Sequence, residues 1–371
     1  MLESFAPTMT APTMVQVAKR AGTTIATVSR VVNNAPGVSP RMRARVLAVV
    51  DELAYVPQAT AQLLRTGRSR IIGIVVGDLA NPRSVSLINS VQAVATAHGL
   101  TAVVASATGS EPDGEISLIG ALMRHRPAGL LVATLRTLAS DRYLTRVADQ
   151  GVPVVLVGRT LQGANLDSVC ANYRRGGQLI TRHLIELGHR RIAFVGAHFD
   201  EGDRVARLRG YLDALQRARL AVRPGLVVGE GQPSAIPRYA TYLTGYQGAQ
   251  RLLRQPTRPT AIVSRNDMVA VGAIQAAREA GLHVPHDISI TGFDNIPLAA
   301  AFAPALTVVS QPTEEEGHLA AELLLARIER PGEGRDPREL TLECNLIVRA
   351  STARPAARRR RGSRRRTSRE E

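Results

Sequence analysis

The sequence predicts a small all-α domain followed by a larger α/β region of two lobes, each a doubly wound parallel sheet. Three observations predict this fold class. Short helical patterns with capping signals occupy residues 13–57, apolar strand-like runs alternate with helical patterns from residue 70 to about 350, and the alternation restarts near residue 171. The 371 residues are enough for one small domain and one large core.

The first two helices should be short and joined by a tight turn. The first begins at Met14 and turns Val17 and Ala18 inward. Gly22 follows, and glycine is the least strained residue where a helix ends in the left-handed conformation. Thr24 stands where a hydroxyl can cap the second helix. This pattern is typical of a helix-turn-helix, although a helical hairpin in a globular core has it too.

The second helix has a buried and an outward face. Its buried side carries Val28, Val31 and Val32. The first residues of such a helix face base edges, so Ile25 and Ala26 can touch thymine methyl groups and Arg30 can reach guanine or a phosphate. Short polar side chains that suit the DNA backbone are Thr24, Thr27, Ser29 and Asn33. The outward face therefore predicts contact with a major groove.

A third helix is expected from about Pro40 to Leu53, with Ser39 as its cap and proline in its first turn. Its apolar stripe is expected to be Val46, Leu47, Val50 and Leu53. Three short helices complete a minimal domain over residues 13–57.

Residues 58–69 contain a short helical pattern from Ala59 to Arg65. Helix nucleation is costly, so we expect this segment to be ordered only on DNA. Leu64 beside Arg65 suits a minor-groove wedge flanked by phosphate contacts. A solvated linker fits the composition about equally well.

The larger region alternates strand-like runs such as IIGIVV, GLLVA and VPVVLV, then RIAFVG, TAIVS and ISITGF, with helical patterns that include residues 85–98, 113–124 and 141–150. Continuous apolar strands are buried on both faces of a parallel sheet. Ligands of such sheets lie beyond the carboxyl ends of the strands, so two facing lobes make a closing trap for a small molecule. The core spans residues 70–350, with the first lobe at 71–170 plus 312–332 and the second at 171–311 plus 333–350.

The formal net charge is +16, and the excess lies mainly in residues 1–70 and 354–371. This distribution favours a DNA-binding end and a solvated tail over a generally adhesive surface. Residues 351–371 should be a basic disordered tail, which either adds salt-sensitive attraction to DNA or is merely solvated. The tail lacks the apolar heptads of a tetramer-forming helix, so we expect a homodimer.

Cysteine usage and hydropathy indicate a cytoplasmic protein. Cys170 and Cys344 are far apart in sequence and fit no ligand spacing or redox motif, so we expect reduced core residues. Residues 1–12 lack the charged and apolar regions of a signal peptide and are expected to be a disordered leader. No segment is apolar for long enough to span a membrane, so no membrane association is expected.

Several segments in the same order resemble the LacI/GalR transcriptional regulators. They are VAKRAGTTIATVSRVVNN, GVSPRMRARV, ELAYVP, ATAQLLRTG, IGIVVGDLANP, HLIELGHRRIAFVG, RLRGYLDAL, IVSRNDMVAVGAIQAAREAGL, DISITGFDN and LTVVSQP. The resemblance extends from Thr13 to about Ala350. It implies a helix-turn-helix headpiece with a hinge helix and a periplasmic-binding-protein-like core.

The resemblance also implies roles in DNA binding. Ile25, Ala26 and Arg30 would contact bases, and Leu64 would be the hinge leucine that opens the centre of the operator from the minor groove. Further DNA contacts carried over from the family are Tyr55 and Ala61. Gln16 departs from the family, which usually has an acidic residue there, and this departure is expected to affect only the capping of the first helix.

The effector site is expected at five residues. Arg207, Asn266, Asp294 and Gln311 match family positions that line the cleft, and Arg83 lies in the loop after the first strand. Opposed donors and acceptors of this kind can hold adjacent hydroxyls of a sugar or polyol. The alternatives are that Asp294 only shapes a turn and that Asn266 only caps the following helix.

Two further departures concern the charge of the ligand. Arg83 and Ser84 replace a bulky pair common in the family, and Gly158 with Arg159 stands where many relatives have an aspartate. If Arg83, Arg159 and Arg207 all faced the cleft, they would suit an acidic or phosphorylated sugar. The alternative is that Arg83 and Arg159 point to solvent.

Catalysis is the rival class of function, and the sequence offers it little support. No phosphate-binding loop or nucleophile elbow is present. His283 and His286 resemble half a metal site without partner ligands, so we expect a turn, and neither catalytic residues nor a cofactor. A second alternative is a sugar-binding module without DNA-binding activity, which the outward Arg30 and the absent export signal disfavour.

The sequence therefore predicts a DNA-binding transcriptional regulator, more readily a repressor, controlled by a small-molecule effector. Two chains would place their recognition helices one DNA turn apart on a near-palindromic operator. By reciprocity, an effector that shifts lobe closure changes the affinity for DNA.

Overall fold

A computed structural model describes residues 12–55, 69–106, 114–133, 138–161, 163–197, 205–229, 241–330 and 336–356. The chain divides into two compact units, Met1–Ser69 and Arg70–Glu371. Nearly all of the expected leader, the hinge helix with Ala61 and Leu64, and the tail beyond residue 356 lie outside the described residues.

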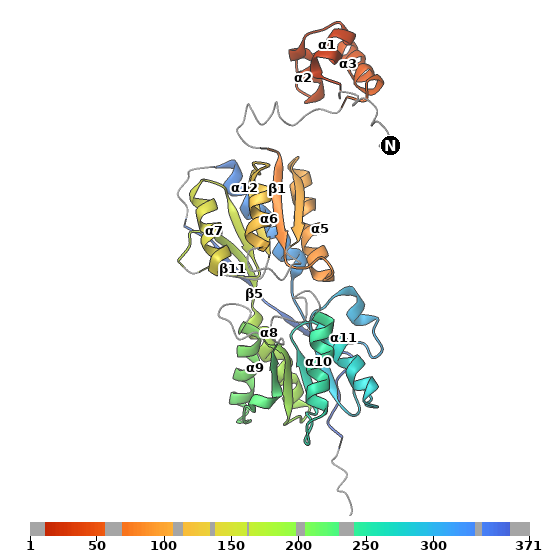
Figure 1. Ribbon diagram of the computed structural model, residues 1–371, viewed down its shortest axis with the longest axis vertical. Helices are drawn as coiled ribbons and strands as arrows, with labels where there is room; N and C mark the ends of the chain where they lie inside the picture. The colour runs from red at the N-terminus through yellow and green to blue at the C-terminus, as the bar shows by residue number, and fades with distance from the viewer. Residues whose placement is uncertain are drawn as a thin grey trace, which may run out of the picture. The chain divides into compact units, whose positions relative to one another are not determined.

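The described residues of the first unit, 12–55 and Ser69, contain three short helices, α1 (Met14–Ala21), α2 (Ile25–Val32) and α3 (Pro40–Glu52) (Figure 1). The predicted start at Met14 is confirmed. Thr13 caps α1 together with Gln16, because Thr13 N donates to Gln16 Oε1 at 2.7 Å and Gln16 N donates to Thr13 Oγ1 at 3.3 Å. Gln16 therefore keeps the cap in spite of its departure from an acidic residue.

The turn between α1 and α2 has the expected geometry. Gly22 adopts φ 63° and ψ 43°, and Thr24 Oγ1 accepts a hydrogen bond from Thr27 N at 3.2 Å. The predicted stripe of α3 is wrong at Leu47, which is 45% exposed, whereas Val49 is buried. Successive helix positions lie about 100° apart, so the stripe that contains Val46 and Val49 excludes Leu47.

The second unit contains two six-stranded sheets, as far as the structure describes the chain. The first sheet is parallel and has the order β11-β5-β4-β3-β1-β2. Its strands are β1 (Ile71–Val76), β2 (Thr101–Ser106), β3 (Gly129–Ala133), β4 (Val154–Val157), β5 (Asp167–Ala171) and β11 (Glu339–Leu342). The near-continuous burial of β1, β3, β4 and β5 confirms the expectation from their apolar runs.

The second sheet has the order β12-β10-β9-β8-β6-β7 and is parallel except where β12 runs antiparallel to β10. Its strands are β6 (Ile192–Ala197), β7 (Val227–Gly229), β8 (Ala261–Ser264), β9 (Ser289–Asp294), β10 (Thr307–Ser310) and β12 (Asn345–Ile347). The two predicted lobes are thus two separate sheets within one unit.

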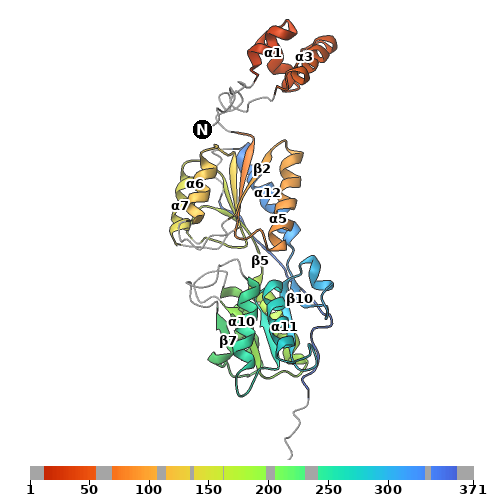
Figure 2. The same cartoon turned by 45° about the vertical axis from the view of Figure 1, so that its right-hand side comes forward.

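Helices cover both faces of each sheet. In the first lobe, α5 (Pro82–Ala97) and α12 (Thr313–Glu329) lie on one side, and α6 (Gly114–Met123) and α7 (Leu138–Asp149) on the other (Figure 2). In the second lobe, α8 (Tyr173–Glu186) and α9 (Ala206–Arg217) share one apolar core, and α10 (Thr241–Leu253) and α11 (Asp267–Glu279) share the other. The described residues of this unit also form the short 3-10 helices η2 (Pro224–Leu226) and η3 (Pro297–Ala300).

The assignment of residues 333–350 to the second lobe is wrong for strand β11. Leu340 pairs with Val169, so residues 339–342 extend the first sheet beside β5. Only β12 joins the second sheet. The chain therefore passes between the lobes three times, after β5, after β10 and after β11. A short edge strand with alternating exposure has too weak an apolar signal to be placed from sequence.

Both cysteines are buried and form no disulfide, as expected. Within the described ranges, no helix is both long and apolar enough to cross a membrane.

The end of the core lies within the second lobe, which corrects the start of the expected disordered tail at residue 351. Ser351 is fully buried, and its hydroxyl donates to Ile290 O at 2.6 Å. His189, also buried, lies 2.9 Å from Ala353 O and 3.1 Å from Ser289 Oγ through Nε2. Together with the backbone hydrogen bond from Ile290 N to Ser351 O at 3.0 Å, these contacts fix residues 351–353 against the second lobe.

Pairs of glycines allow close helix contact in the second lobe. A Cβ on Gly210 of α9 would overlap the carbonyl oxygen of Arg174 in α8, and one on Gly177 would overlap the carbonyl oxygen of Arg207. Gly245 and Gly272 permit the same approach between α10 and α11. These crossings bring the first turns of α8 and α9 into backbone contact, and the first turn of α9 carries Arg207, one of the expected cleft residues.

We expect Gly210→Ala to lower the free energy of unfolding by about 1–3 kcal/mol, because the added methyl group must displace backbone atoms. Urea-induced unfolding measures this change. Gly225→Ala is the control, since the nearest atom to its Cβ would be Gln255 Nε2 at 3.8 Å. Equal stability of the two variants would contradict the close crossing.

Acid should weaken the second lobe through His189. Burial lowers the pKa of His189 below its usual value of 6.5. The unfolded chain then binds more protons than the folded chain as pH falls below about 6.5, so folded stability decreases in that range. We expect His189→Gln to be less stable at pH 7.5 and to show a shallower loss between pH 7 and 5. His318→Gln, an exposed site on α12, should keep the wild-type slope.

Candidate functional site

The outward surface of α2 has the exposure expected for a recognition helix. Ile25 is 48% exposed, and Ala26 and Arg30 are exposed, whereas Val28 is fully buried. Of the polar residues around them, Thr24 and Asn33 are exposed and Thr27 and Ser29 half-buried. The structure therefore brings together on one surface most of the residues predicted to contact DNA.

Some of these polar groups also stabilise the helix itself. The hydroxyls of Thr24 and Thr27 lie 3.0 Å apart at the amino end of α2, and Asn33 Nδ2 donates to Ser29 O at 2.7 Å. Their capping role is compatible with DNA contact because an N-cap threonine still presents its hydroxyl at the helix end.

Tyr55 is placed differently from the expectation. It is 6% exposed and packs in the apolar core of the first unit with Val17, Val28 and Val46. Tyr55 follows α3 in the sequence, and its packing in this core explains its position. The predicted contacts of Ala61 and Leu64 fall outside the described residues.

Arg43 was not predicted, and it holds the loop after α2. It donates from Nη2 to Ala35 O at 2.7 Å and from Nη1 to Asn34 Oδ1 at 2.9 Å. Asn34 has φ 52°, a left-handed conformation that these contacts stabilise. An arginine in a helix with many arginines carries no sequence signal for such a contact.

The five expected effector residues all lie beyond the carboxyl ends of strands. Arg83 is in the first turn of α5 after β1, Arg207 is in α9 after β6, and Asn266 follows β8. Asp294 ends β9, and Gln311 follows β10. Helix α5 begins at Pro82, before the expected residue 85, because Asn81 Oδ1 caps it by accepting from Arg83 N at 3.0 Å.

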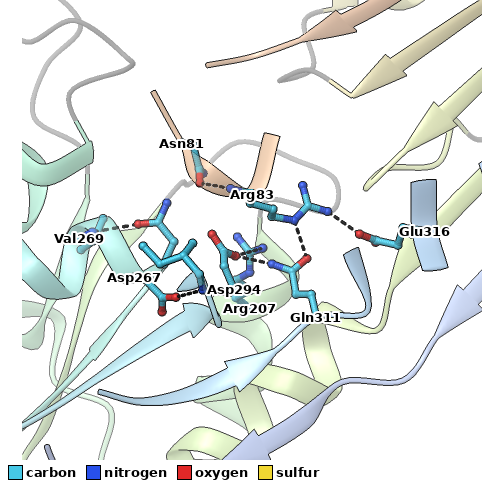
Figure 3. A network of polar contacts seen from close by, with 10 residues as sticks. Asn81, Arg83, Arg207, Asp267, Val269, Asp294, Gln311 and Glu316 are labelled. Atoms are coloured by element: carbon cyan, nitrogen blue, oxygen red, sulfur yellow. Dashed lines mark hydrogen bonds and ion pairs between the residues drawn. The ribbon is translucent and has the colours of Figure 1, made fainter. Parts of the chain in front are cut away.

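A chain of hydrogen bonds connects three of these residues (Figure 3). Arg83 Nε donates to Gln311 Oε1 at 3.2 Å, and Gln311 Nε2 donates to Asp294 Oδ1. Arg207 Nη2 lies 3.7 Å from the same Asp294 oxygen. Arg83 also donates from Nη2 to Glu316 Oε2 at 2.5 Å. The contacts run from α5 of the first lobe to β9 of the second.

Aromatic rings fix the guanidinium of Arg207. Its Cζ lies 4.3 Å from the ring centre of Phe293 and 4.5 Å from that of Tyr173. Such cation–π contacts hold a charged group in a defined position, and they are stronger where the pair is removed from water. Arg207 Nε is buried and makes no hydrogen bond with any described residue. Tyr173 was not predicted as part of this site.

Asn266 has a structural role. It is 6% exposed, and its Oδ1 caps α11 by accepting from Val269 N at 2.9 Å. This contact corresponds to the alternative left open from the sequence. Among the described residues, no hydrogen bond joins Asn266 to Asp294, Arg207 or Gln311.

Asp294 stands at a turn with unusual backbone angles. It has φ 122° and Asn295 has φ 62°. Asp267 supports the turn, because its buried Oδ2 accepts from Ile296 N at 2.8 Å. Burial, together with the charge of Asp294, raises the pKa of Asp267 well above its usual value. Burial also raises the pKa of Asp294, although Arg207 and Arg83 oppose this shift.

A cavity of about 470 Å³ opens beside this network. Its volume suits a small ligand. Arg83, Asp294 and Gln311 line it, whereas Arg207 and Asn266 do not. The remaining lining residues are Ser86, Asn295, Ile296, Pro297, Ser310, Pro312, Thr313, Glu314 and Glu315.

The cluster of three arginines considered for an acidic ligand is not formed. Arg159 is only 3% exposed, so it does not point to solvent, and it pairs with Asp141 through Nη1. Its Nη2 lies 3.6 Å from Glu115 Oε1. Arg83 pairs with Glu316 instead. Each guanidinium thus has its own carboxylate, and only Arg83 and Arg207 reach Asp294 or Gln311.

No group of three or more histidine, cysteine, aspartate or glutamate residues suited to a metal occurs in the part of the chain that the structure describes.

Comparison with known proteins assigns both units. Residues 13–58 match the family "Bacterial regulatory proteins, lacI family", and residues 181–352 match the family "Periplasmic binding protein-like domain". The ribose operon repressor of Haemophilus influenzae is 32% identical over 91% of this chain and 98% of its own length.

Two solved structures are also similar. A complex of the transcriptional regulator CelR with cellobiose has 31% identity, a TM-score of 0.66, and coverage of 92% of this chain and 99% of its own. The Lac repressor dimer bound to operator and the anti-inducer ONPF has 27% identity, a TM-score of 0.77, and coverage of 93% and 100%. With its recognition surface, its two-lobed core and relatives that match it along nearly their whole length, this chain belongs to the lacI family of bacterial regulatory proteins.

Proposed function

We propose that this protein is a DNA-binding repressor whose affinity for operator DNA is controlled by a small-molecule effector held in the core. The observation that carries the proposal is the combination of two surfaces in one chain. Ile25, Ala26 and Arg30 form an outward face on a capped helix, and Arg83, Gln311 and Asp294 form a connected polar network beside a ligand-sized cavity.

The DNA partner is a near-palindromic operator bound by a homodimer. The similar Lac repressor was solved as a dimer on operator, which supports this arrangement. Exposed valines support self-association of the core. Val103 and Val104 on the edge strand β2 are each 36% exposed, and Val85 on the neighbouring helix α5 is 44% exposed. An edge strand that exposes apolar side chains is normally covered by a partner.

The effector is a carbohydrate or a related polyol. The names of a ribose operon repressor and of a cellobiose complex among the relatives support this class. The chemistry of the cleft supports it as well, because arginine donors and aspartate acceptors converge on one small volume. The proposal includes no catalytic residue, cofactor or metal, and it places the protein in the cytoplasm, where operator DNA is found.

Control by the effector follows from the position of the network. Arg83 belongs to the first lobe, Asp294 to the second, and Gln311 to a connection between them. A ligand that engages Asp294 or Arg83 changes the contacts across the lobes and hence their closure. Strand β1 directly follows the DNA-binding unit in sequence, and binding at either site then biases the other.

Selection of genomic fragments on the full-length protein tests the DNA-binding function. We expect recovery of one related set of sites, and Arg30→Ala should weaken binding to them by about tenfold to a hundredfold, because one base or phosphate contact is worth about 1–3 kcal/mol. Arg142→Ala on α7 is the charge-matched control and should bind like wild type. Failure to recover any site would favour a sugar-binding module without DNA-binding activity.

The hinge leucine yields a second prediction. Leu64→Ala should lower operator affinity, because a smaller side chain cannot wedge between base pairs in the minor groove. Fluorescence anisotropy with a selected site measures the loss, and the thermal unfolding of the core should stay unchanged. Leu63→Ala provides the matched control. Unaltered affinity of the Leu64 variant would exclude the wedge.

A further inference from the structure

Glu316 is a buried carboxylate behind Arg83, which lines the proposed effector cleft. It lies in the first turn of α12 and is fully buried, whereas the adjacent Glu314 and Glu315 are exposed. Acidic side chains in the first turn of a helix interact favourably with the helix dipole, and they do so from an exposed position as well. Burial of Glu316 therefore needs a separate reason, since an ionised group inside a protein requires a partner.

Arg83 is that partner. Its Nη2 donates to Glu316 Oε2 at 2.5 Å, and the Arg83 side chain is only 17% exposed. Burial opposes the charged form of Arg83, but the carboxylates of Glu316 and Asp294 more than offset it and raise its pKa. The other oxygen of Glu316, Oε1, makes no hydrogen bond with any described residue. The pair is therefore charged, close and largely removed from water.

Each of the two arginines at the cleft lies beside a carboxylate. Arg83 pairs with Glu316, and Arg207 lies beside Asp294. A phosphate or carboxylate ligand would need a guanidinium with a free edge, because such anions are bound through paired N–H groups. Glu316 already occupies one edge of Arg83, and Gln311 accepts from its Nε.

We propose that Glu316 is a specificity-determining residue of the cleft. Its carboxylate binds the guanidinium of Arg83, and the cleft therefore excludes anionic ligands in favour of neutral, hydroxyl-rich ones. This inference rests on the proposed effector function of the cleft. Glu316, which is not one of the five effector residues expected from the sequence, would thus determine which charge a bound ligand can carry.

The polar groups that remain open fit such a ligand. Arg83 Nη1 and Asp294 Oδ2 make no hydrogen bond within the described part of the chain, and both residues line the cavity. One offers donors and the other an acceptor. A hydroxyl group can accept from the first and donate to the second, whereas a carboxylate or a fully ionised phosphate group can only accept. An anion in the cavity would also face the carboxylates of Asp294, Glu314 and Glu315, which line it.

Binding of inorganic phosphate to the full-length protein tests the inference directly. Glu316→Gln keeps the size of the side chain but removes the charge that competes at Arg83. We expect this variant to bind phosphate about tenfold or more tightly than wild type in isothermal titration calorimetry. Glu322→Gln, an exposed site on the same helix with the same change in net charge, should bind like wild type. Arg83→Met combined with Glu316→Gln should lose the gain.

Each result decides the question. Equal phosphate affinity of wild type and Glu316→Gln, or a gain that survives removal of Arg83, would overturn the proposal. If Glu316→Gln does not fold, Glu316→Asp retracts the carboxylate from Arg83 and should give a smaller gain, and no gain there counts against the proposal. The measurement uses neither DNA nor effector, so its failure is distinguishable from failure of the proposed repressor function.

Discussion

The guanidinium of Arg83 is held between Gln311 and Glu316, and Gln311 passes this constraint on to Asp294. Because these groups are largely buried, they have lost most of their hydration. Each charged group therefore needs an oppositely charged or hydrogen-bonding partner that offsets the lost solvation energy. The requirement fixes the direction of the Gln311 amide, the position of the first turn of α5 and the orientation of the Asp294 carboxylate. The cleft is thereby organised before any ligand enters it.

The surrounding fold supplies the precision that this network needs. Glycine pairs bring α8 against α9 and α10 against α11, and these crossings fix the helix ends next to the cleft. Asp267 holds the turn at Asp294 through the amide of Ile296, and two aromatic rings hold Arg207. A chemically simple set of side chains is thus made selective by the backbone and the rings around it.

The sequence was sufficient for features that depend on local patterns. Capping residues, the glycine turn and the apolar strands predicted the three helices and the two sheets, and the resemblance to the LacI/GalR regulators implied that Asp294 and Gln311 lie at the cleft. It was insufficient for contacts between distant segments. Glu316 looked like an ordinary acidic residue at a helix start, Arg43 like one surface arginine among many, and strand β11 was too short and too polar to be assigned to a sheet. Leu47 and Tyr55 show the same limit, because contacts with α1 and α2 decide which face of α3 is buried and whether the residue after it is covered.

The three passages of the chain between the lobes have a mechanical consequence. Three roughly adjacent covalent connections resist twisting and sliding far more than a single connection would, so the permitted relative motion is mainly a bend about one axis. A ligand that contacts both lobes can thus change little except the angle between them. Different ligands would then produce the same kind of motion, and the ligand-contacting residues could change in evolution while the three connections stay the same.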